Sequence, residues 1–279
     1  MKADCHIHMV LDGVYWKDAI GRHADGVDEG FIIRALDRYR ELGYQYLRDG
    51  GDRWGVGKRA RELAEERGIR YRTPLAPLCK AGHYGAFIGQ KYENYKEYMQ
   101  LVREHRRQGA DFIKIMISGL MDFDRFGLLT EEGLPAEEIG ELIHIAHEEG
   151  FSVMAHANGA RVIRAAAEAG VDSVEHGAYA DGEALAAMAE MGTVWVPTVS
   201  TVGNLLGKGR FDEGAVRAIL ENALENIGAF ARMGGTLAVG SDAGAWAVGH
   251  GCESEEGWLL KVCTEEQLAQ GNRRIMGKF

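Results

Sequence analysis

The sequence predicts an α/β fold, a (β/α)8 TIM barrel, and three observations carry this prediction. Short β-type runs alternate with helical patterns eight times along the 279 residues. Many of the helical patterns end on a glycine just before the next run, as a helix C-cap favours. These glycines are Gly43, Gly68, Gly109, Gly150, Gly170 and Gly192. No linker or low-complexity tract interrupts the alternation, so we expect residues 1–279 to form a single domain.

The β-type runs are spaced as successive strands of a parallel barrel. We expect the strands at residues 3–10, 44–50, 69–78, 111–118, 151–157, 171–177, 194–200 and 236–244. The apolar periodicity between them predicts helices, the clearest at residues 28–42, 93–108, 135–149 and 215–233. The longest irregular stretches, 79–91, 119–134, 201–213 and 245–263, all follow strands. In a (β/α)8 barrel these positions surround the catalytic mouth.

Charge and composition exclude several classes of function. Lys and Arg total 32 against 42 Asp and Glu, a net charge of -10, and an acidic chain without a basic stripe is a poor nucleic-acid binder. No apolar run reaches the roughly 18 residues that a membrane span needs, so we expect no membrane partner. The four cysteines form no CxxC pair and no signal peptide precedes the first strand, which favours reduced thiols in a cytoplasm.

Two strands carry polar side chains that an apolar core does not explain. His6 and His8 stand at i and i+2 in "ADCHIHMV", so both leave the same side of the first strand. Taken alone they are also compatible with two polar residues at a strand end. Lys114 lies inside "FIKIMI", where a charged amine is costly unless it is paired, chemically changed or directed outward to water.

The remaining candidates end later strands. His156 ends the fifth strand in "MAHANG", His176 the sixth in "VEHG", and Asp242 the eighth in "GSDAG". Each by itself is explained equally well by a satisfied structural residue. Together with His6, His8 and Lys114 they form a set of ordinary zinc ligands on the face where barrel enzymes carry their chemistry.

This ordered set resembles the amidohydrolase superfamily. "AHANGARVIRAAAEAGVDSVEHG" and "SDAG" followed by "GHG" are most similar to the branch of imidazolonepropionase-like enzymes and Xaa-Pro or other hydrophobic-dipeptide hydrolases. The resemblance implies two divalent metal ions, with zinc expected first and manganese or iron as alternatives. It places one ion on His6, His8 and Asp242 and the other on His156 and His176. Lys114, carboxylated by carbon dioxide, would bridge the two ions.

The resemblance also implies a reaction. A metal-bridging hydroxide would attack the carbonyl of an amide C–N bond in a dipeptide or N-acyl amino acid, a small-molecule substrate. Asp242 would act as general base and then as general acid. A lactonase, a cyclic-amide hydrolase or a carbamate hydrolase stays open, because the same hydroxide attacks any activated carbonyl. Lys114 disfavours a mononuclear deaminase, and Asp242 disfavours a non-catalytic metal-binding barrel, which needs no base.

Two features depart from the family pattern. Many members carry a β-sandwich built from both chain ends, whereas His6 lies close to the start here and one final helix follows the last strand. We therefore expect a barrel without the accessory β-sandwich domain, an arrangement that would favour a homo-oligomer. Where the branch often has "HAHG" this chain has "HANG", so Asn158 takes the place of a second histidine at the substrate site.

Further residues near the expected mouth are candidates for substrate contact. The resemblance implies that His83, beside Tyr84 in "AGHYG", helps bind substrate, and that Tyr179 in "EHGAY" contacts the scissile carbonyl or a substrate carboxylate. We therefore count His83 and Tyr179 with Lys114 and Asp242 as catalytic candidates. His250 matches the "HG" of the family loop and would form a lid with Trp246. The charged residues after the second strand, Arg48, Asp49 and Arg53, are expected to pair with one another at the rim.

Overall fold

Parallel strand pairing organises the structure. The computed structural model describes residues 1–279, and every named strand pair is parallel. The strands are β1 (Lys2–Ile7), β2 (Tyr44–Asp49), β3 (Arg70–Arg72), β4 (Leu78–Lys80), β5 (Gln90–Tyr92), β6 (Ile113–Met116), β7 (Val153–Ala157), β8 (Ser173–His176), β9 (Val194–Val196) and β10 (Thr236–Leu237). The third predicted strand is divided into β3 and β4. Pro74 and Pro77 lie in the gap, and proline has no N–H to donate to a strand ladder.

Backbone hydrogen bonds close the strands into a ring. The strands form two sheets, ordered β1-β2-β3 and β10-β9-β8-β7-β6-β4-β5. At one junction Cys5 N donates to Val239 O (2.8 Å) and Asp242 N donates to His6 O (2.7 Å). At the other, Asp111 N donates to Thr73 O (3.0 Å). The predicted α/β barrel is thereby confirmed, while β5, which pairs only with β4 inside a predicted loop, was not predicted.

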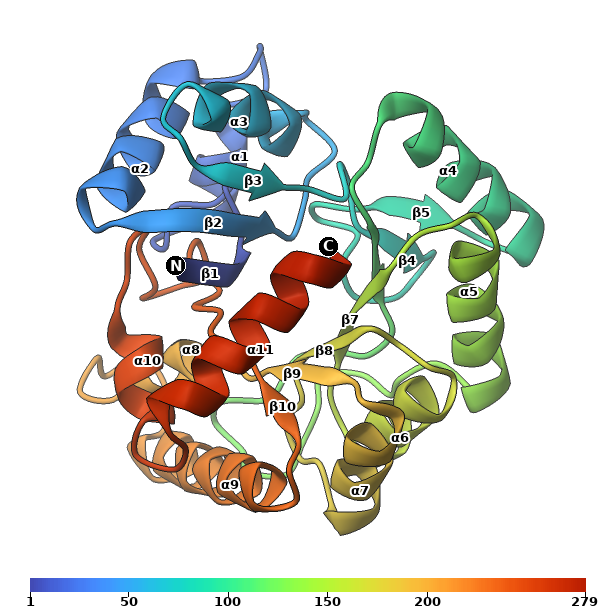
Figure 1. Cartoon of the computed structure of the whole chain (residues 1–279), viewed down its shortest axis with the longest axis vertical. Helices are drawn as coiled ribbons and strands as arrows, with labels where there is room; N and C mark the ends of the chain where they lie inside the picture. The colour runs from blue at the N-terminus through green and yellow to red at the C-terminus, as the bar shows by residue number, and fades with distance from the viewer.

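Helices surround the ring (Figure 1). They are α1 (Trp16–Gly21), α2 (Glu29–Glu41), α3 (Val56–Glu65), α4 (Tyr95–Gln108), α5 (Ala136–Glu148), α6 (Ala160–Glu168), α7 (Gly182–Met191), α8 (Ser200–Gly203), α9 (Glu213–Arg232), α10 (Ser254–Leu259) and α11 (Glu265–Lys278). The C-caps Gly109 and Gly192 have φ of 79° and 68°, a left-handed conformation in which glycine carries no Cβ penalty. No helix is both long enough and apolar enough to cross a lipid bilayer.

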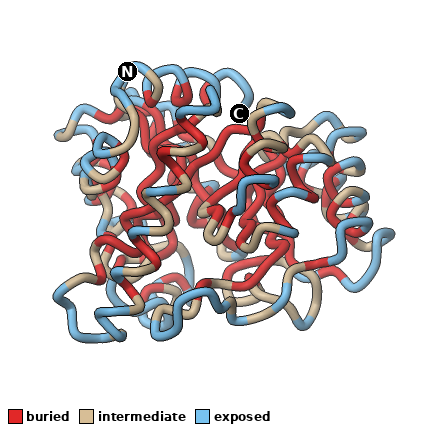
Figure 2. Tube along the Cα trace, turned by 90° about the horizontal axis from the view of Figure 1, so that it is seen from below, coloured by how far each residue is buried: buried red, intermediate tan, exposed pale blue.

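The last helix closes one end of the barrel. Figure 1 shows α11 lying across the middle of the ring. Ile275 and Met276 of α11, with Phe279 directly after it, are buried in one cluster with Cys5 of β1 and with Phe112, which directly precedes β6. The buried segments accordingly occupy the centre of the molecule and the exposed ones its periphery (Figure 2). Because α11 fills this end, access to the barrel interior is left to the opposite end, where the strands finish.

Candidate metal centre

His6 is held inside the barrel with one ring nitrogen free. Its side chain on β1 is fully buried, and Nδ1 lies 2.7 Å from Glu175 Oε2. A carboxylate oxygen only accepts, so Nδ1 carries the hydrogen and Nε2 keeps its lone pair. Lys114 Nζ, from β6, lies 3.1 Å from this Nε2. The first strand therefore presents a neutral imidazole to the lysine at the centre of the barrel.

His8, Lys114 and Asp242 complete a tight cluster with His6. Lys114 Nζ lies 3.3 Å from His8 Nε2. Asp242 Oδ1 lies 3.6 Å from both His6 Nε2 and His8 Nε2. The ligand atoms of His6, His8 and Asp242 all fall within 4.8 Å of one another. Strands at opposite ends of the sequence supply them, because β1 adjoins the segment after β10 in the closed ring.

His156 and His176 form a second pair beside this cluster. Their ring centroids lie 4.6 Å apart. His156 Nε2 donates to Gly119 O (3.1 Å), and His176 Nδ1 donates to Thr198 Oγ1 (2.7 Å). The Thr198 hydroxyl itself donates to Pro197 O at 2.7 Å, which fixes it as the acceptor for His176. Each histidine thus keeps one ring nitrogen with a lone pair.

The donor set fits a divalent metal ion. Imidazole nitrogens and a carboxylate are ordinary zinc ligands. Two buried polar atoms of the cluster, His8 Nδ1 and Asp242 Oδ1, have no hydrogen-bond partner within the protein. Buried polar atoms are normally paired, so an unpaired carboxylate oxygen among ring nitrogens marks a place that a cation satisfies. His156 and His176 lie outside the group of three whose ligand atoms converge.

Burial controls the protonation of the site. It lowers the pKa of Lys114 to about 8, although the carboxylates of Asp242 and Glu175 oppose this shift. It raises the pKa of Asp242 to about 7, against the opposing charge of Lys114. It lowers the pKa of His156 to about 3, with Lys114 adding to the effect. The site therefore favours neutral imidazoles, which are the ligand form, and a lysine more readily deprotonated than a surface lysine.

The strand ends at the site have a strained backbone. His176, Thr198 and Asp242 have φ of 66°, 52° and 58°. This left-handed region is uncommon for residues other than glycine, and it costs roughly 1–3 kcal/mol for each residue held there. The sequence signal for these positions was the strand-end location alone. The strain shows that the surrounding structure holds these three residues where the side chains meet.

Glu175 and Arg48 are the residues at the centre that sequence reasoning missed. The prediction that Arg48 pairs with Asp49 and Arg53 at the rim is wrong: its side chain is fully buried, and Nη2 donates to Glu175 Oε1 at 2.7 Å. Arg48 Nε donates to Cys5 O, also at 2.7 Å. The sequence did indicate Glu175 as a candidate, since it directly precedes His176 within a predicted strand. Its partner Arg48 could not be predicted, because it lies 127 residues away.

The predicted substrate residues divide into two groups. Tyr84 and Asn158 line the cavity above the cluster, and the Tyr84 ring lies 4.9 Å from that of His156. His83, Tyr179 and His250 are not part of this lining. His83 Nδ1 lies 3.7 Å from Glu131 Oε1 on a loop, and the Tyr179 ring packs against Phe126.

His250, predicted to contact substrate as part of a lid, lies outside the cavity lining. Both of its ring nitrogens already have partners: Nε2 donates to Leu11 O (2.9 Å), and Nδ1 lies 3.3 Å from the Tyr39 hydroxyl. We therefore place His250 in the support of the loop after β1. Trp246, its expected partner in a lid, does line the cavity. Asn158 also has structural bonds, since Oδ1 accepts from Ala178 N and Nδ2 donates to Gly119 O, both at 3.0 Å.

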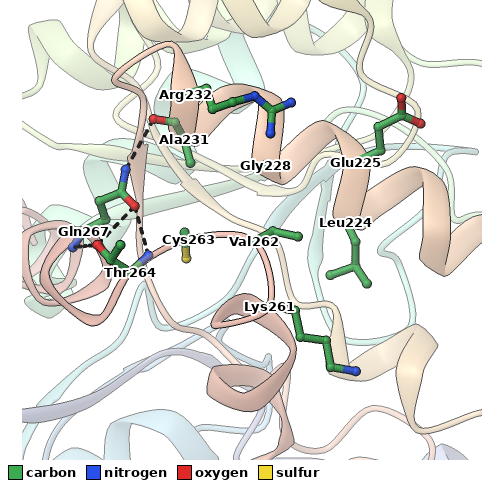
Figure 3. A pocket seen from close by; sticks show the side chains of 10 residues that line it. All are labelled: Leu224, Glu225, Gly228, Ala231, Arg232, Lys261, Val262, Cys263, Thr264 and Gln267. Carbon is green, nitrogen blue, oxygen red and sulfur yellow. Dashed lines mark hydrogen bonds between the residues drawn. The ribbon is translucent and has the colours of Figure 1, made fainter.

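One cavity opens onto the cluster of His8, Lys114 and Asp242. It has a volume of about 690 Å³, and 15 of its 27 lining residues are hydrophobic. A second cavity, about 610 Å³, lies outside the barrel between α9 and α11 (Figure 3). There Gln267 Nε2 donates to Ala231 O (3.3 Å), and Thr264 and Gln267 cap α11. Only the first cavity joins metal-ligating side chains to a space of ligand size.

Known proteins share this architecture. Over 174 residues the chain is 30% identical to ochratoxinase from Aspergillus niger, a match that covers 58% of this chain and 35% of the fungal protein. The crystal structure of that ochratoxinase aligns with a TM-score of 0.77 at 20% identity, over 99% of this chain and 69% of that one. The structure of a Xaa-Pro dipeptidase with methionine bound in its active site aligns with a TM-score of 0.76 at 22% identity. The alignment covers 99% of this chain and 72% of the dipeptidase. The structure of an amidohydrolase aligns with a TM-score of 0.76 at 23% identity, and the alignment covers 99% of this chain and 74% of that one. These solved structures, a Xaa-Pro dipeptidase and an amidohydrolase among them, share the fold of this chain.

The extent of this amidohydrolase resemblance differs between sequence and structure. No family model matches the chain. The sequence match spans about a third of the length of ochratoxinase, 35%. The structural matches instead cover 99% of this chain, so the shared fold extends over the whole barrel, including the segments that carry His6 and Asp242.

Proposed function

We propose that this chain is a metal-dependent hydrolase that cleaves an amide C–N bond in a dipeptide or N-acyl amino acid. The observation that carries the proposal is the position of Lys114. Its buried Nζ lies 3.1 and 3.3 Å from two histidine nitrogens, at the floor of a cavity of about 690 Å³. A lysine held among metal-ligating groups is the residue that distinguishes this chemistry from a plain histidine metal site.

The residues of the site divide into two ligand groups. His6, His8 and Asp242 would hold one divalent ion and His156 and His176 the other, with zinc expected first. Divalent ions bound there supply Lewis acidity and activate water at neutral pH. The hydrogen bonds to Glu175, Gly119 and Thr198 leave each of three histidines with a free lone pair, which supports this division.

Lys114 would bridge the two groups as a carbamate. The neutral amine would attack carbon dioxide, the N–C bond forming as one C–O π bond opens onto oxygen, and the proton lost from nitrogen would pass to water. The lowered pKa of Lys114, about 8, favours the neutral amine that this step needs. The carbamate is an anion. Lys114 would then carry a negative charge that two metal ions stabilise, instead of a buried positive charge that costs free energy.

Asp242 would carry the proton of the reaction. As water adds to the amide carbon, Asp242 accepts its proton and then gives it to the leaving nitrogen as the C–N bond breaks. Its carboxylate lines the cavity, and Oδ1 has no hydrogen-bond partner within the protein.

The first experiment measures metal content by elemental analysis of protein purified without chelator. We expect about two zinc or manganese ions per chain in the wild type and a sharp fall in Lys114→Ala. Carbon-13 NMR after incubation with labelled bicarbonate would show a carbamate signal in the wild type that is missing in the variant. Metal that stays substoichiometric after addition of metal and bicarbonate would contradict the binuclear site.

The second experiment measures turnover on matched substrates. A panel of dipeptides and N-acyl amino acids, with lactones, hydantoins and carbamates beside them, separates the amide reaction from its alternatives. Asp242→Asn should reduce kcat by about 10²-fold or more while some metal stays bound, because proton transfer is lost. A near-wild-type rate in Asp242→Asn would contradict this mechanism, and turnover confined to lactones would replace the proposed reaction.

A further inference from the structure

Arg210 brings a positive charge into the cavity wall. It lies in the segment between α8 and α9 and, apart from Lys114, is the only lysine or arginine that lines the cavity. Its guanidinium lies 4.3 Å from the ring centroid of Trp246 and 5.2 Å from that of Phe211. Trp246 follows the proposed proton carrier Asp242 by four residues. Arg210 is exposed to solvent, and its guanidinium lies against two aromatic rings beside the site.

The charge of Arg210 has no carboxylate partner. No acidic oxygen lies within ion-pair distance of its guanidinium, whereas the nearby Arg125 is paired with Asp122 at 2.6 Å. Asp124 also lines the cavity, and its Oδ1 accepts a hydrogen bond from Asp212 N (2.8 Å) on the segment that carries Arg210. Arg210 therefore contacts aromatic rings and is free to bind an anion.

A stacked guanidinium is suited to one kind of ligand. Its planar fork of N–H donors matches a carboxylate through two parallel hydrogen bonds, and contact with aromatic rings restricts the side chain before the ligand arrives. The remaining cation of the lining, Lys114, is surrounded by the metal-ligand side chains. Most of the lining is apolar, so away from the metal-ligand residues Arg210 is the cationic side chain that an anionic group on a bound molecule meets.

On the basis of the amide hydrolysis proposed above, we propose that Arg210 is a specificity-determining residue that binds a free carboxylate of the substrate. The preferred substrates are then dipeptides and N-acyl amino acids with a free C-terminal carboxylate, rather than their amides or esters. This places the carboxylate contact on the α8–α9 segment instead of on Tyr179. The ring of Tyr179 packs against Phe126, and Tyr179 lies outside the cavity lining.

A pair of uncleavable ligands tests this without turnover. The acid 2-benzyl-4-phenylbutanoate has the shape of an N-benzoyl amino acid without its amide, and 2-benzyl-4-phenylbutan-1-ol is its neutral counterpart. Titration calorimetry on the wild type should give a Kd about tenfold or more lower for the acid than for the alcohol. Arg210→Gln should bring the two Kd values together by weakening the acid alone, and Arg210→Lys should retain part of the preference.

Two variants serve as controls. Arg53 is stacked on Trp54 (4.6 Å) but lies outside the cavity lining, so Arg53→Gln removes a matched arginine and should leave both Kd values unchanged. Tyr179→Phe should leave the preference for the acid intact. Loss of that preference in Tyr179→Phe, with Arg210→Gln unchanged, would return the carboxylate contact to the tyrosine.

The outcomes separate this inference from the proposed function. Equal or undetectable binding of acid and alcohol by the wild type, or wild-type affinity for the acid in Arg210→Gln, overturns the role of Arg210 even if amides are hydrolysed. A preference for the acid that depends on Arg210, in a protein that hydrolyses no amide, keeps the carboxylate site and removes the proposed reaction. If amides are hydrolysed, Arg210→Gln should raise KM for N-benzoyl-phenylalanine and leave kcat nearly unchanged.

Discussion

Glu175 connects the metal-ligand histidine His6 to the buried Arg48. One carboxylate oxygen accepts from His6 Nδ1 and the other from Arg48 Nη2, each at 2.7 Å, and all three side chains are fully buried. Ser173 Oγ also donates to Glu175, at 2.5 Å. A carboxylate that fixes the tautomer of a ligand histidine also raises its basicity. Glu175 is therefore a positioning residue, and it acts on the site through His6.

Replacing Glu175 by glutamine leaves Arg48 as an unpaired buried charge. We expect Glu175→Gln to lower the free energy of unfolding by roughly 3–5 kcal/mol, the usual cost of breaking a buried pair. Metal affinity should fall by about 10–100-fold, because His6 loses the partner that fixes its tautomer. Urea denaturation measures the first quantity, and competition with a chelator measures the second.

A double variant separates these two effects. Arg48→Met with Glu175→Gln removes both charges, so it should recover part of the lost stability but not the lost metal affinity. The single variant Arg48→Met completes the comparison. If the double variant lost as much stability as the two single variants added together, Glu175 and Arg48 would not interact.

At the scale of elements, α11 lies directly against β10. Gly271, in the middle of α11, has no room for a side chain: a Cβ there would lie 1.7 Å from Leu237 O on β10. Asn272, the next residue, accepts a hydrogen bond from Val239 N at 2.9 Å. The helix is therefore held to the strand by close backbone approach, and Ile275 and Phe279 can reach the barrel interior.

One methyl group at Gly271 should move the whole helix. We expect Gly271→Ala to destabilise the protein by several kcal/mol, because backbone atoms cannot rearrange as a flexible side chain can. Gly277 is the matched control in the same helix, since a Cβ there meets nothing within 4 Å. Gly277→Ala should stabilise by about 0.5–1 kcal/mol, the difference in helix propensity. Chemical denaturation of both variants measures this contrast, and equal effects would contradict the close packing.

At the scale of the whole molecule, Asp172 links three distant segments. Its carboxylate accepts from Lys278 Nζ (2.7 Å) at the end of α11 and from Val153 N (2.8 Å) at the start of β7. It also accepts from His147 Nε2 on α5 at 3.0 Å. Burial alone would raise the pKa of Asp172, but the hydrogen bonds from His147 and Lys278 lower it below the usual 3.8.

This lowered pKa predicts a defined dependence of stability on pH. Between the folded and unfolded pKa values the unfolded chain binds more protons, so stability rises with pH there and is fully present above the unfolded value. We expect Asp172→Asn to cost roughly 1 kcal/mol near pH 7. The difference from wild type should shrink as the pH falls below about 4, where Asp172 of the unfolded chain becomes protonated first, and disappear below the lower folded pKa. Urea denaturation at several pH values measures it, and a difference that grows towards low pH would contradict the assignment.

An exposed carboxylate provides the comparison for this pH series. Glu168 pairs with Arg164 at 2.8 Å one helical turn away, and both side chains are about half exposed. Glu168→Gln should change stability by no more than about 0.5 kcal/mol at any of these pH values, because water screens such pairs.

The sequence by itself determined the barrel and the set of candidate ligands. Strand alternation, helix periodicity and glycine C-caps are local properties, so the βα units could be predicted from the sequence. Histidines and a carboxylate at strand ends, with Lys114 inside an apolar run, followed from the same local pattern. The two prolines at 74 and 77 likewise explain the divided third strand.

Only the tertiary structure decided which distant residues meet. Arg48 and Glu175 are 127 residues apart, and nothing local distinguishes a buried arginine after one strand from a rim arginine. Arg210 and Trp246 come from separate loops, whose long irregular sequences carry no periodic pattern. Closing the ring fixes the register of neighbouring strands, and that register places these side chains together. The sequence therefore supplied the groups of the site, and the closed barrel supplied their distances, their hydrogen-bond partners and the wall of the cavity.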